Sequence, residues 1–488
     1  MHVIGLNSVN NKDIDNIRLS VNQKLNPENK SKYGQFMTPS NIADFMADLF
    51  HQDDEGANTG AKLLDCGAGI GSLTISAVNK LKCIEHLDLW EIDPIMQEHL
   101  ALNMQKLDVP STIYTADFIF DAVKTLLSES EEKYTHAILN PPYKKINSHS
   151  EYRKALRKVG IETVNLYSAF MALTIKLAKK GGQIVAIIPR SFCNGPYYKT
   201  FRELLFLDCA IEHIHLFQSR NQAFKDDGVL QENIIIKLVK GAKQGKVIIS
   251  QSKNADFKDY SEETFDFENI VKPNDAELFI RLPTNKDIDE RLFEVSLSEI
   301  GLNVSTGPVV DFRIKDLLER QPQGDNAPLL YPHHFEEGRL VYPKEHKKPN
   351  AIRVSSTSQK WLMPNDGYYV IVKRFSAKEE KRRVVANVVR PKDIGEDNRW
   401  IGFENHWNVF HVNKRGFDKT TAMGLACFLN STILDEYFRI FSGHTQVNAT
   451  DLKNILYPSL KKLHELGKNY QIGMGQVQVD DLLEFVSK

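Results

Sequence analysis

The chain has 488 residues, with 62 Lys and Arg against 63 Asp and Glu and a formal net charge of −1. Its 42% hydrophobic and 26% charged residues are ordinary for a folded globular protein and exclude the disordered, collagen-like and disulfide-scaffold classes. At about 100–200 residues per domain, the length predicts two to four domains.

Several kinds of segment are missing from the sequence. No apolar run approaches the roughly 18 residues of a membrane helix, so we expect no membrane association. The start, MHVIGLNSVNNKD, has no basic stretch followed by an apolar one, so we expect no secretory signal. The five cysteines form no CxxC pair, which argues against a zinc site or a disulfide framework and favours a cytoplasmic location. We also expect no bound metal.

Short apolar runs alternate with helical patterns between about residues 40 and 240. This alternation indicates βαβ units, and therefore an α/β fold with a mostly parallel sheet. Such sheets bind ligands on the loops at the carboxyl ends of their strands. The predicted strands are 61–64, 86–90, 135–139 and 183–188, and the predicted helices are 72–81, 94–107 and 166–180.

The two ends of the chain differ from this central part. Residues 1–30 are polar and predict an arm or a short irregular helix. Residues 240–265 suggest a hairpin and then a polar connector, and we place a domain boundary near 270. The rest predicts a mixed α+β domain, with β-like runs at 367–375, 383–389 and 406–412 and a helical stretch at 420–441.

A glycine-rich bend, DCGAGIG at 65–71, follows the first predicted strand. Gly67, Gly69 and Gly71 allow a sharp turn and a close approach of a ligand. The carboxylate of Asp65 can accept hydrogen bonds at the strand end. The spacing fits neither the dinucleotide pattern GxGxxG nor a P-loop.

Acidic residues follow two further apolar stretches. Glu91 and Asp93 stand at the tip of the second strand, where a carboxylate can accept from two vicinal ribose hydroxyls. Either residue can take that place, and an acid there can also be a helix cap. Asp117 is a third acid. Three acids without a phosphate-binding lysine predict a nucleoside-type ligand with positive rather than negative charge.

The most specific string is NPPY at 140–143, directly after a predicted strand. The prolines favour an extended backbone and offer no competing N–H. The Asn140 side-chain carbonyl and the Pro141 backbone carbonyl can therefore point the same way and accept both hydrogens of a planar amino group. This draws the nitrogen lone pair out of conjugation and makes it nucleophilic. Tyr143 offers a flat face for an aromatic ring.

In this order, these motifs resemble those of the S-adenosylmethionine-dependent amino-methyltransferases. QFMTP at 35–39 and NLYSAF at 165–170 are similar to motifs of the gamma group of DNA adenine-N6 methyltransferases, the TaqI- and Eco57I-like enzymes of restriction-modification systems. The resemblance covers about residues 30–240 well and 442–458 loosely. It implies a Rossmann-like catalytic domain at 31–270, with helices on both faces of its sheet, and a DNA target-recognition domain at 271–488.

The resemblance also implies roles for individual residues. The S-adenosylmethionine site would consist of Thr38, Asp65, Gly67, Gly69, Gly71, Glu91, Asp117 and Phe170, with Glu91 on the ribose and Asp117 on the adenine amino group. The catalytic residues would be Asn140, Pro141, Pro142 and Tyr143, and the target base would stack on Tyr143 and Phe224.

A positively charged stretch lies in the second predicted domain. Residues 341–390 hold 12 Lys and Arg against 4 Asp and Glu, an excess of 12 − 4 = +8. Taken alone, it fits a solvated surface as well as a phosphate-facing one. If the domain binds DNA, the candidate phosphate contacts are Lys347, Lys348, Arg353, Lys373, Arg374, Lys381, Arg382 and Arg383.

The implied reaction is methyl transfer to N6 of an adenine flipped out of double-stranded DNA. It would proceed by in-line displacement without a covalent intermediate. We expect a monomer that acts beside a cognate restriction endonuclease without a stable complex. Two alternatives stay open: an N-methyltransferase acting on RNA or on protein glutamine, and a DNA cytosine-N4 methyltransferase. A nuclease fusion is disfavoured because no PD…ExK-like set is present, and an inactive fold because NPPY is intact.

Overall fold

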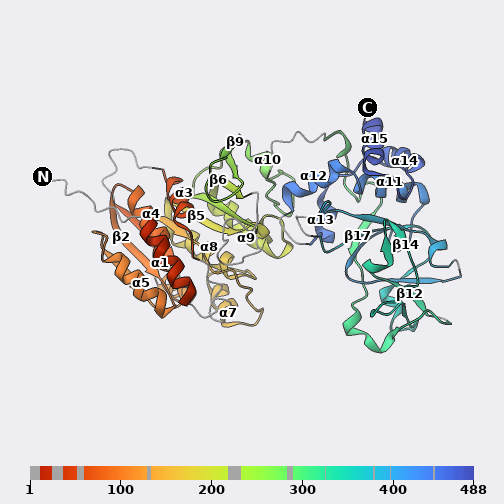
Figure 1. The fold of residues 1–488 in the computed structure, drawn as a ribbon, viewed down its shortest axis with the longest axis horizontal. Helices are drawn as coiled ribbons and strands as arrows, with labels where there is room; N and C mark the ends of the chain where they lie inside the picture. Colours follow the sequence, from red (N-terminus) through yellow and green to blue (C-terminus); the bar gives the residue numbers. More distant parts are fainter. Residues whose placement is uncertain are drawn as a thin grey trace. The chain divides into compact units, whose positions relative to one another are not determined.

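The computed structural model describes residues 11–24, 37–51, 60–128, 133–217, 232–282, 290–324, 326–376, 380–395, 397–442 and 446–487. It divides into two compact units, Met1–Pro283 and Thr284–Lys488 (Figure 1). The sequence placed a boundary near residue 270. Each unit is described by itself.

The first unit contains one large sheet and its flanking helices. The strands are β1 Ala61–Cys66, β2 Ile84–Trp90, β3 Ser111–Tyr114, β4 Tyr134–Leu139, β5 Ala178–Pro189, β6 Cys209–Phe217, β7 Asn233–Lys240, β8 Val247–Ser252 and β9 Ser261–Phe265. The helices are α1 Asn11–Lys24, α3 Ser40–Asp48, α4 Ser72–Lys80, α5 Pro94–Met104, α6 Phe118–Ser128, α7 Glu151–Lys158, α8 Leu166–Leu177, α9 Lys199–Asp208 and α10 Phe267–Ile270.

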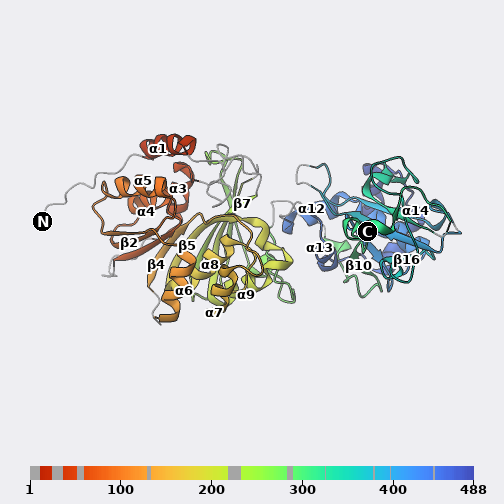
Figure 2. The same ribbon diagram turned by 90° about the horizontal axis from the view of Figure 1, so that it is seen from below.

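The strands of the described residues in this unit pair in the order β3-β2-β1-β4-β5-β7-β6-β8-β9. From β3 to β5 all neighbours are parallel, whereas β7 runs antiparallel to both β5 and β6. The central parallel strands β1 and β4 and the second half of β5 are almost entirely buried, because helices cover both faces of the sheet (Figure 2). The predicted α/β fold with a mostly parallel sheet is therefore confirmed.

Two apolar cores lie on the two faces of this sheet. One contains Phe118 of α6, Phe170 of α8 and Leu205 of α9. The other contains Met46 of α3 and Leu100 of α5. Parallel strands between two covered faces bring the loops after β1, β2, β3 and β4 to one edge of the sheet, which is where the sequence motifs lie.

Two predicted elements differ in the structure. The helix predicted at 166–180 ends at Leu177, and Ala178 already pairs with Tyr134 as the start of β5. The hairpin predicted near 240–252 is wrong, because β8 pairs in parallel with β6 and not with β7. The expected polar connector contains β9, which pairs antiparallel with β8. Near the N-terminus, residues 11–24 form a regular helix whose Ile14 and Val21 are buried.

The second unit contains short strands and a group of helices at its end. The strands are β10 Asn303–Thr306, β11 Leu318–Glu319, β12 Ala327–Leu330, β13 Phe335–Glu336, β14 Arg339–Leu340, β15 Ala351–Ile352, β16 Leu362–Pro364, β17 Tyr369–Lys373, β18 Ala386–Val389, β19 Trp400–Phe403 and β20 Trp407–His411. The helices are α11 Lys419–Leu429, α12 Thr432–Phe441, α13 Ala449–Asn454, α14 Leu460–Asn469 and α15 Gln476–Ser487.

The strands of the second unit's described residues form sheets in the orders β10-β20-β17-β18, β11-β15-β12-β19-β16 and β13-β14. The helical stretch predicted at 420–441 is two helices, because Ser431 accepts the backbone N–H of Leu434 and starts α12 as its N-cap. None of the helices in the described parts of the chain is both long and apolar enough to span a membrane.

Candidate active site

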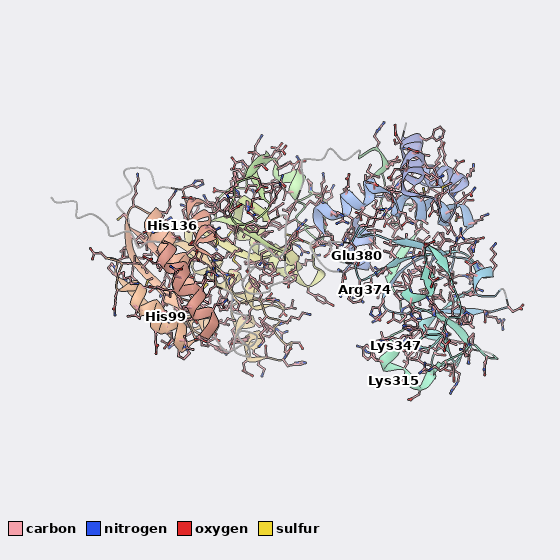
Figure 3. All side chains as sticks on the ribbon, in the orientation of Figure 1. His99, His136, Lys315, Lys347, Arg374 and Glu380 are labelled. Atoms are coloured by element: carbon pink, nitrogen blue, oxygen red, sulfur yellow. The ribbon has the colours of Figure 1, made fainter. Side chains whose placement is uncertain are left out.

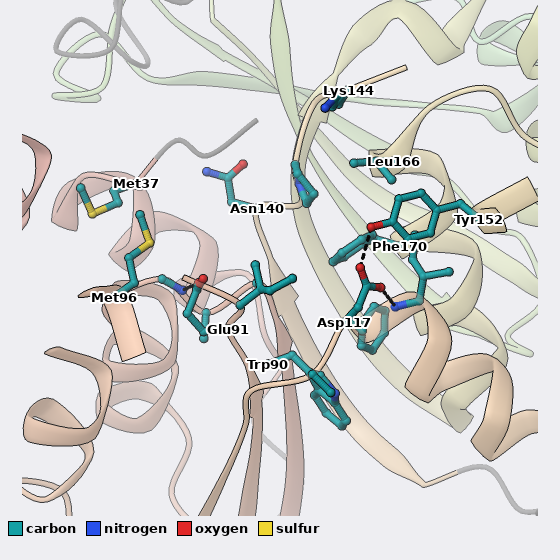
Figure 4. A pocket seen from close by; sticks show the side chains of 18 of the residues that line it. Met37, Trp90, Glu91, Met96, Asp117, Asn140, Lys144, Tyr152, Leu166 and Phe170 are labelled. Atoms are coloured by element: carbon teal, nitrogen blue, oxygen red, sulfur yellow. Dashed lines mark hydrogen bonds between the residues drawn. The ribbon is translucent and has the colours of Figure 1, made fainter. Parts of the chain in front are cut away.

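One cavity of about 390 Å³ lies at the carboxyl ends of β1, β2 and β4 (Figure 4). This volume is within the usual range for a small-molecule site. Segments that are far apart in the sequence meet in its wall: Met37 and Thr38, the glycine bend, the tip of β2, the loop after β3, NPPY and the start of α8. The predicted site residues among its lining are Thr38, Gly67, Gly69, Glu91, Asp117, Asn140, Pro142 and Phe170.

The glycine bend forms one wall of the cavity. Gly67, Gly69 and Gly71 have backbone φ values of 105°, 59° and 91°, which residues other than glycine rarely adopt. At Gly71 an added methyl group would also meet the Met104 side chain at 2.9 Å. Gly71 itself does not line the cavity; it starts α4 as its N-cap. The bend is therefore fixed by its backbone and leaves the space in front of Gly67 and Gly69 open.

Asp65 lies beneath the bend and not in the cavity wall. Its side chain is fully buried, and its Oδ2 accepts a hydrogen bond from Thr74 Oγ1 at 2.7 Å. Its Oδ1 has no hydrogen-bond partner among the described residues. Burial raises the pKa of Asp65 to about 7. The sequence led us to expect a direct contact between Asp65 and the ligand. Asp65 does not line the cavity, because the glycine bend that it supports covers it.

Glu91 occupies the position predicted for the ribose acid. Its Oε2 accepts the backbone N–H of Gly69 at 2.8 Å, and its Oε1 accepts that of Asp93 at 2.7 Å. Burial raises the pKa of Glu91 to about 7. Asp93, the other candidate, accepts the backbone N–H groups of Ile95 and Met96 as the N-cap of α5. Of the two acids, only Glu91 lines the cavity.

Asp117 follows β3 and lines the cavity on the opposite side of Trp90 from Glu91 (Figure 4). Its Oδ1 accepts the backbone N–H of Ile119 at 2.9 Å, and its Oδ2 accepts the hydroxyl of Tyr152 at 2.6 Å. Phe170 lies nearby, with its ring centroid 5.0 Å from that of Phe118. This end of the cavity combines a carboxylate with flat apolar walls.

The carboxamide of Asn140 is held at both ends. Its Nδ2 donates to Thr38 Oγ1 at 3.1 Å, and its Oδ1 accepts from the Tyr143 hydroxyl at 2.8 Å. Thr38 is only 4% exposed, so this bond is shielded from water. An amide carbonyl oxygen can accept two hydrogen bonds. Asn140 and the glycine bend line the same cavity, as the sequence predicted.

The other NPPY residues are placed differently from one another. Pro142 lines the cavity, whereas Pro141 and Tyr143 do not. The Tyr143 hydroxyl is also within 3.1 Å of the Ile187 carbonyl, and its ring lies edge-on to Tyr167. Burial raises the pKa of Tyr143 well above its ordinary value, so its hydroxyl stays a donor. Phe224, the second predicted stacking residue, lies outside the described residues.

The predicted DNA contacts in the second unit fall into three groups. Lys347, labelled with Arg374 in Figure 3, is exposed, as is Lys381, and neither has an ion pair among the described residues. Three others are paired with acids: Lys348 with Asp311, Arg353 with Glu319 and Lys373 with Glu380.

Three arginines of the stretch bind the protein itself. Arg374 donates to the Asn405 carbonyl at 3.2 Å. Arg382 donates to the Ser431 carbonyl at 2.8 Å, and Arg383 is 1% exposed. A guanidinium buried as deeply as that of Arg383 cannot reach a phosphate, so the DNA contact expected for Arg383 is corrected to a structural role.

Sequence reasoning did not single out several residues of the cavity wall. Trp90 directly precedes Glu91, so its place at the strand tip gave a usable signal. Met96 lies in α5 and Tyr152 in α7, and no motif marked them. Tyr152 reaches the site only because α7 packs beside α6, a tertiary contact that the local pattern does not encode.

Comparison with known protein families supports the fold and the motifs. Residues 75–224 match the family model described as Eco57I restriction-modification methylase. The chain is 50% identical to the Type II methyltransferase M.BsuBI of Bacillus subtilis, over 96% of this chain and 97% of that protein. It is 42% identical to the Type II methyltransferase M.PstI of Providencia stuartii, over 96% of each.

Two solved structures share the overall fold. A DrdV–DNA complex matches with a TM-score of 0.53 at 13% identity, over 92% of this chain and 58% of that one. A nuclease-deletion mutant of the Type ISP restriction-modification enzyme LlaGI, in complex with a DNA substrate mimic, matches with a TM-score of 0.51 at 12% identity, over 94% and 56%. This chain spans somewhat more than half of either. Because the chain is 50% and 42% identical to M.BsuBI and M.PstI over nearly its full length, it belongs to the type II methyltransferases, the DNA-methylating enzymes of restriction-modification systems.

Proposed function

We propose that this enzyme transfers a methyl group to the exocyclic N6 amino group of an adenine that is extruded from duplex DNA. The observation that carries the proposal is the Asn140 carboxamide, fixed between Thr38 and Tyr143 at the wall of the cavity that the glycine bend also lines. A fixed carbonyl acceptor beside a nucleoside-sized cavity suits a planar amino group. RNA and protein glutamine no longer compete as substrates, because the family methylates DNA.

S-adenosylmethionine is the proposed cofactor, and the residues present fit it. Glu91 offers acceptors at the strand tip where a ribose is usually bound, and Asp117 offers them at the aromatic end of the cavity. When bound, the cofactor supplies a methyl group on an already activated sulfonium centre.

The protein's own contribution would be orientation and polarisation of the target amine. Asn140 Oδ1 would accept one amino hydrogen and the Pro141 carbonyl the other. The Tyr143 hydroxyl keeps Asn140 Oδ1 in place, and Thr38 keeps the carboxamide from rotating. Held in this way, the amine would face the methyl group that the cofactor would supply, and the amine proton would go to water. Extrusion of the base is necessary because the amino group is not accessible inside a duplex.

Incubation of duplex DNA with the full-length enzyme and S-adenosylmethionine labelled on the methyl group tests this proposal. After digestion to nucleosides, we expect the label on N6-methyladenine. Asn140→Ala should lower the methylation rate about 10²–10³-fold, whereas calorimetric binding of S-adenosylhomocysteine should change little. Label on N4-methylcytosine would establish the cytosine alternative. An unchanged rate in Asn140→Ala would refute the role of Asn140.

We propose further that the enzyme acts as a monomer and protects sites that a cognate restriction endonuclease cuts, without a stable complex between the two. The relatives M.BsuBI and M.PstI are type II methyltransferases, which supports the restriction-modification part of this proposal. Long-read sequencing of DNA from cells that express the chain would identify the modified sequence. Sedimentation of the purified enzyme at several concentrations would reveal any dimer.

A further inference from the structure

Tyr152 contributes a hydroxyl to the cavity wall that no motif of the sequence assigns. It lies in the first turn of α7, and its hydroxyl donates to Asp117 Oδ2 at 2.6 Å (Figure 4). Both residues line the cavity. The bond joins α7 to the loop that precedes α6.

This bond and a second one fix the carboxylate of Asp117. Its Oδ1 accepts the backbone N–H of Ile119 at 2.9 Å, so each carboxylate oxygen already has one donor. The plane of the carboxylate is thereby set, and each oxygen keeps a lone pair for a ligand. The Tyr152 hydroxyl has a single proton, which it donates in its hydrogen bond to Asp117. This corner therefore presents acceptors and no hydroxyl donor toward a ligand.

The apolar side chains around Asp117 and Tyr152 favour a flat ring at this end of the cavity. The Tyr152 ring stacks on Phe120 with centroids 5.3 Å apart and planes 28° apart. Phe170 and Ile119 line the cavity beside it. Apolar faces that converge on fixed acceptors fit a heteroaromatic base with an amino substituent, and they disfavour one with a carbonyl oxygen in its place.

We propose that Tyr152 is a specificity-determining residue of this enzyme: through Asp117 it makes the cofactor site select a 6-aminopurine over a 6-oxopurine. The inference rests on the proposed cofactor and deepens it. A site built to bind a hydrogen-bond donor rejects an analogue that lacks a donor at that position, because the acceptors that the bound ligand covers are then left unpaired. Without the tyrosine hydroxyl, the carboxylate can turn or take a water molecule, and the discrimination weakens.

Calorimetric titration of the full-length enzyme with two compounds tests this. S-adenosylhomocysteine carries the 6-amino group, and S-inosylhomocysteine carries a 6-oxo group instead. We expect the unmodified enzyme to prefer the amino compound by at least about 100-fold. Tyr152→Phe should weaken binding of the amino compound about tenfold and leave binding of the oxo compound unchanged.

Tyr134→Phe is the matched control. The Tyr134 hydroxyl donates to Asp88 Oδ2 at 2.9 Å, a bond of the same kind in the same unit, and Tyr134 does not line the cavity. Its removal should leave both affinities as they are. If Tyr152→Phe weakens both compounds equally, Tyr152 only anchors α7 and the proposal is wrong. An enzyme that binds both equally well also overturns it, and one that binds neither refutes the cofactor assignment itself.

Discussion

At the scale of single residues, Thr38 and Asn140 connect two motifs that are about a hundred positions apart. The Thr38 hydroxyl accepts from Asn140 Nδ2 at 3.1 Å and thereby sets which way the carboxamide points. If the amide turned over, its NH₂ group would face the target amine and repel it. In the proposed mechanism Thr38 would thus serve the reaction through Asn140, in addition to lining the cavity proposed for the cofactor.

Thr38→Val keeps the shape of the side chain and removes the hydroxyl. We expect kcat to fall about 5- to 13-fold, because the cost of one hydrogen bond is on the order of 1–1.5 kcal/mol. Thr38→Ser should restore most of it. Steady-state kinetics with S-adenosylmethionine and duplex DNA measures both. A rise in KM for the cofactor with an unchanged kcat would show instead that Thr38 serves only cofactor binding.

Asp65 makes stability depend on pH. Burial raises its pKa from 3.8 to about 7. The folded chain therefore binds this proton more tightly than the unfolded chain does between about pH 4 and 7. The free energy of unfolding falls as pH rises through this window, and it levels off above it. Glu91, whose pKa burial also raises to about 7, acts in the same direction.

Asp65→Asn removes one of these two titrations. Between pH 5 and pH 8 the parent protein should lose roughly 1–3 kcal/mol more stability than this variant. Thermal unfolding of the ligand-free protein at both pH values measures the difference. Asp48→Asn, at an exposed carboxylate, is the control and should follow the parent. Identical pH dependence of Asp65→Asn and the parent would contradict the assigned burial effect.

At the scale of elements, the sequence predicted the βαβ part of the catalytic unit because its signals are local. Strands such as β1 and β4 are short apolar runs bounded by glycine or proline, and their ends lie within two residues of the predicted ones. The helix predicted at 166–180 ran three residues too far because Ala178 fits a helix as well as a strand. Ala178 belongs to a strand because it pairs with Tyr134, which is distant in the sequence.

The candidate site shows the same division between local and distant signals. The glycine bend, Glu91 and Asn140 stand at strand ends, so the sequence located them. Asp65 and Gly71 belong to the same bend, yet they lie under the cavity wall, and only the packing of α4 and α5 reveals that. Tyr152 depends entirely on how α7 packs against α6. Residues that reach a site from another element cannot be found from local pattern.

In the second unit, α11 and α14 touch through glycines. A methyl group added to Gly424 would overlap the Leu463 carbonyl oxygen, and one added to Gly467 would overlap that of Thr420. Gly424→Ala should therefore separate the two helices and lower the unfolding temperature of this unit by several degrees, since overpacking costs about 1–3 kcal/mol. Affinity for S-adenosylhomocysteine, measured by calorimetry, should stay the same. Gly245→Ala, where the added methyl group meets nothing, is the control.

At the scale of the whole molecule, a net charge of −1 hides the local excess of +8 over residues 341–390. The structure separates the cations of this stretch by their surroundings. Lys347 and Lys381 are exposed and without an ion pair among the described residues, whereas the backbone N–H of Arg383 donates to Asp435 and its guanidinium to Ser442. Phosphate contacts require charges that remain accessible, so the two lysines are the better candidates.

The double variant Lys347→Ala/Lys381→Ala should weaken binding to duplex DNA equally for all sequences. Each lost phosphate contact lowers the slope of log affinity against log salt by about 0.9, so we expect a change of about 1.8. Fluorescence anisotropy with labelled duplexes between low and moderate salt measures this slope. Arg415→Ala, at an exposed arginine already paired with Asp366, should leave it unchanged. Arg383→Ala should lower the unfolding temperature instead, because it removes a buried group from its hydrogen bonds. An unaltered slope in the double variant would mean that DNA meets the second unit elsewhere.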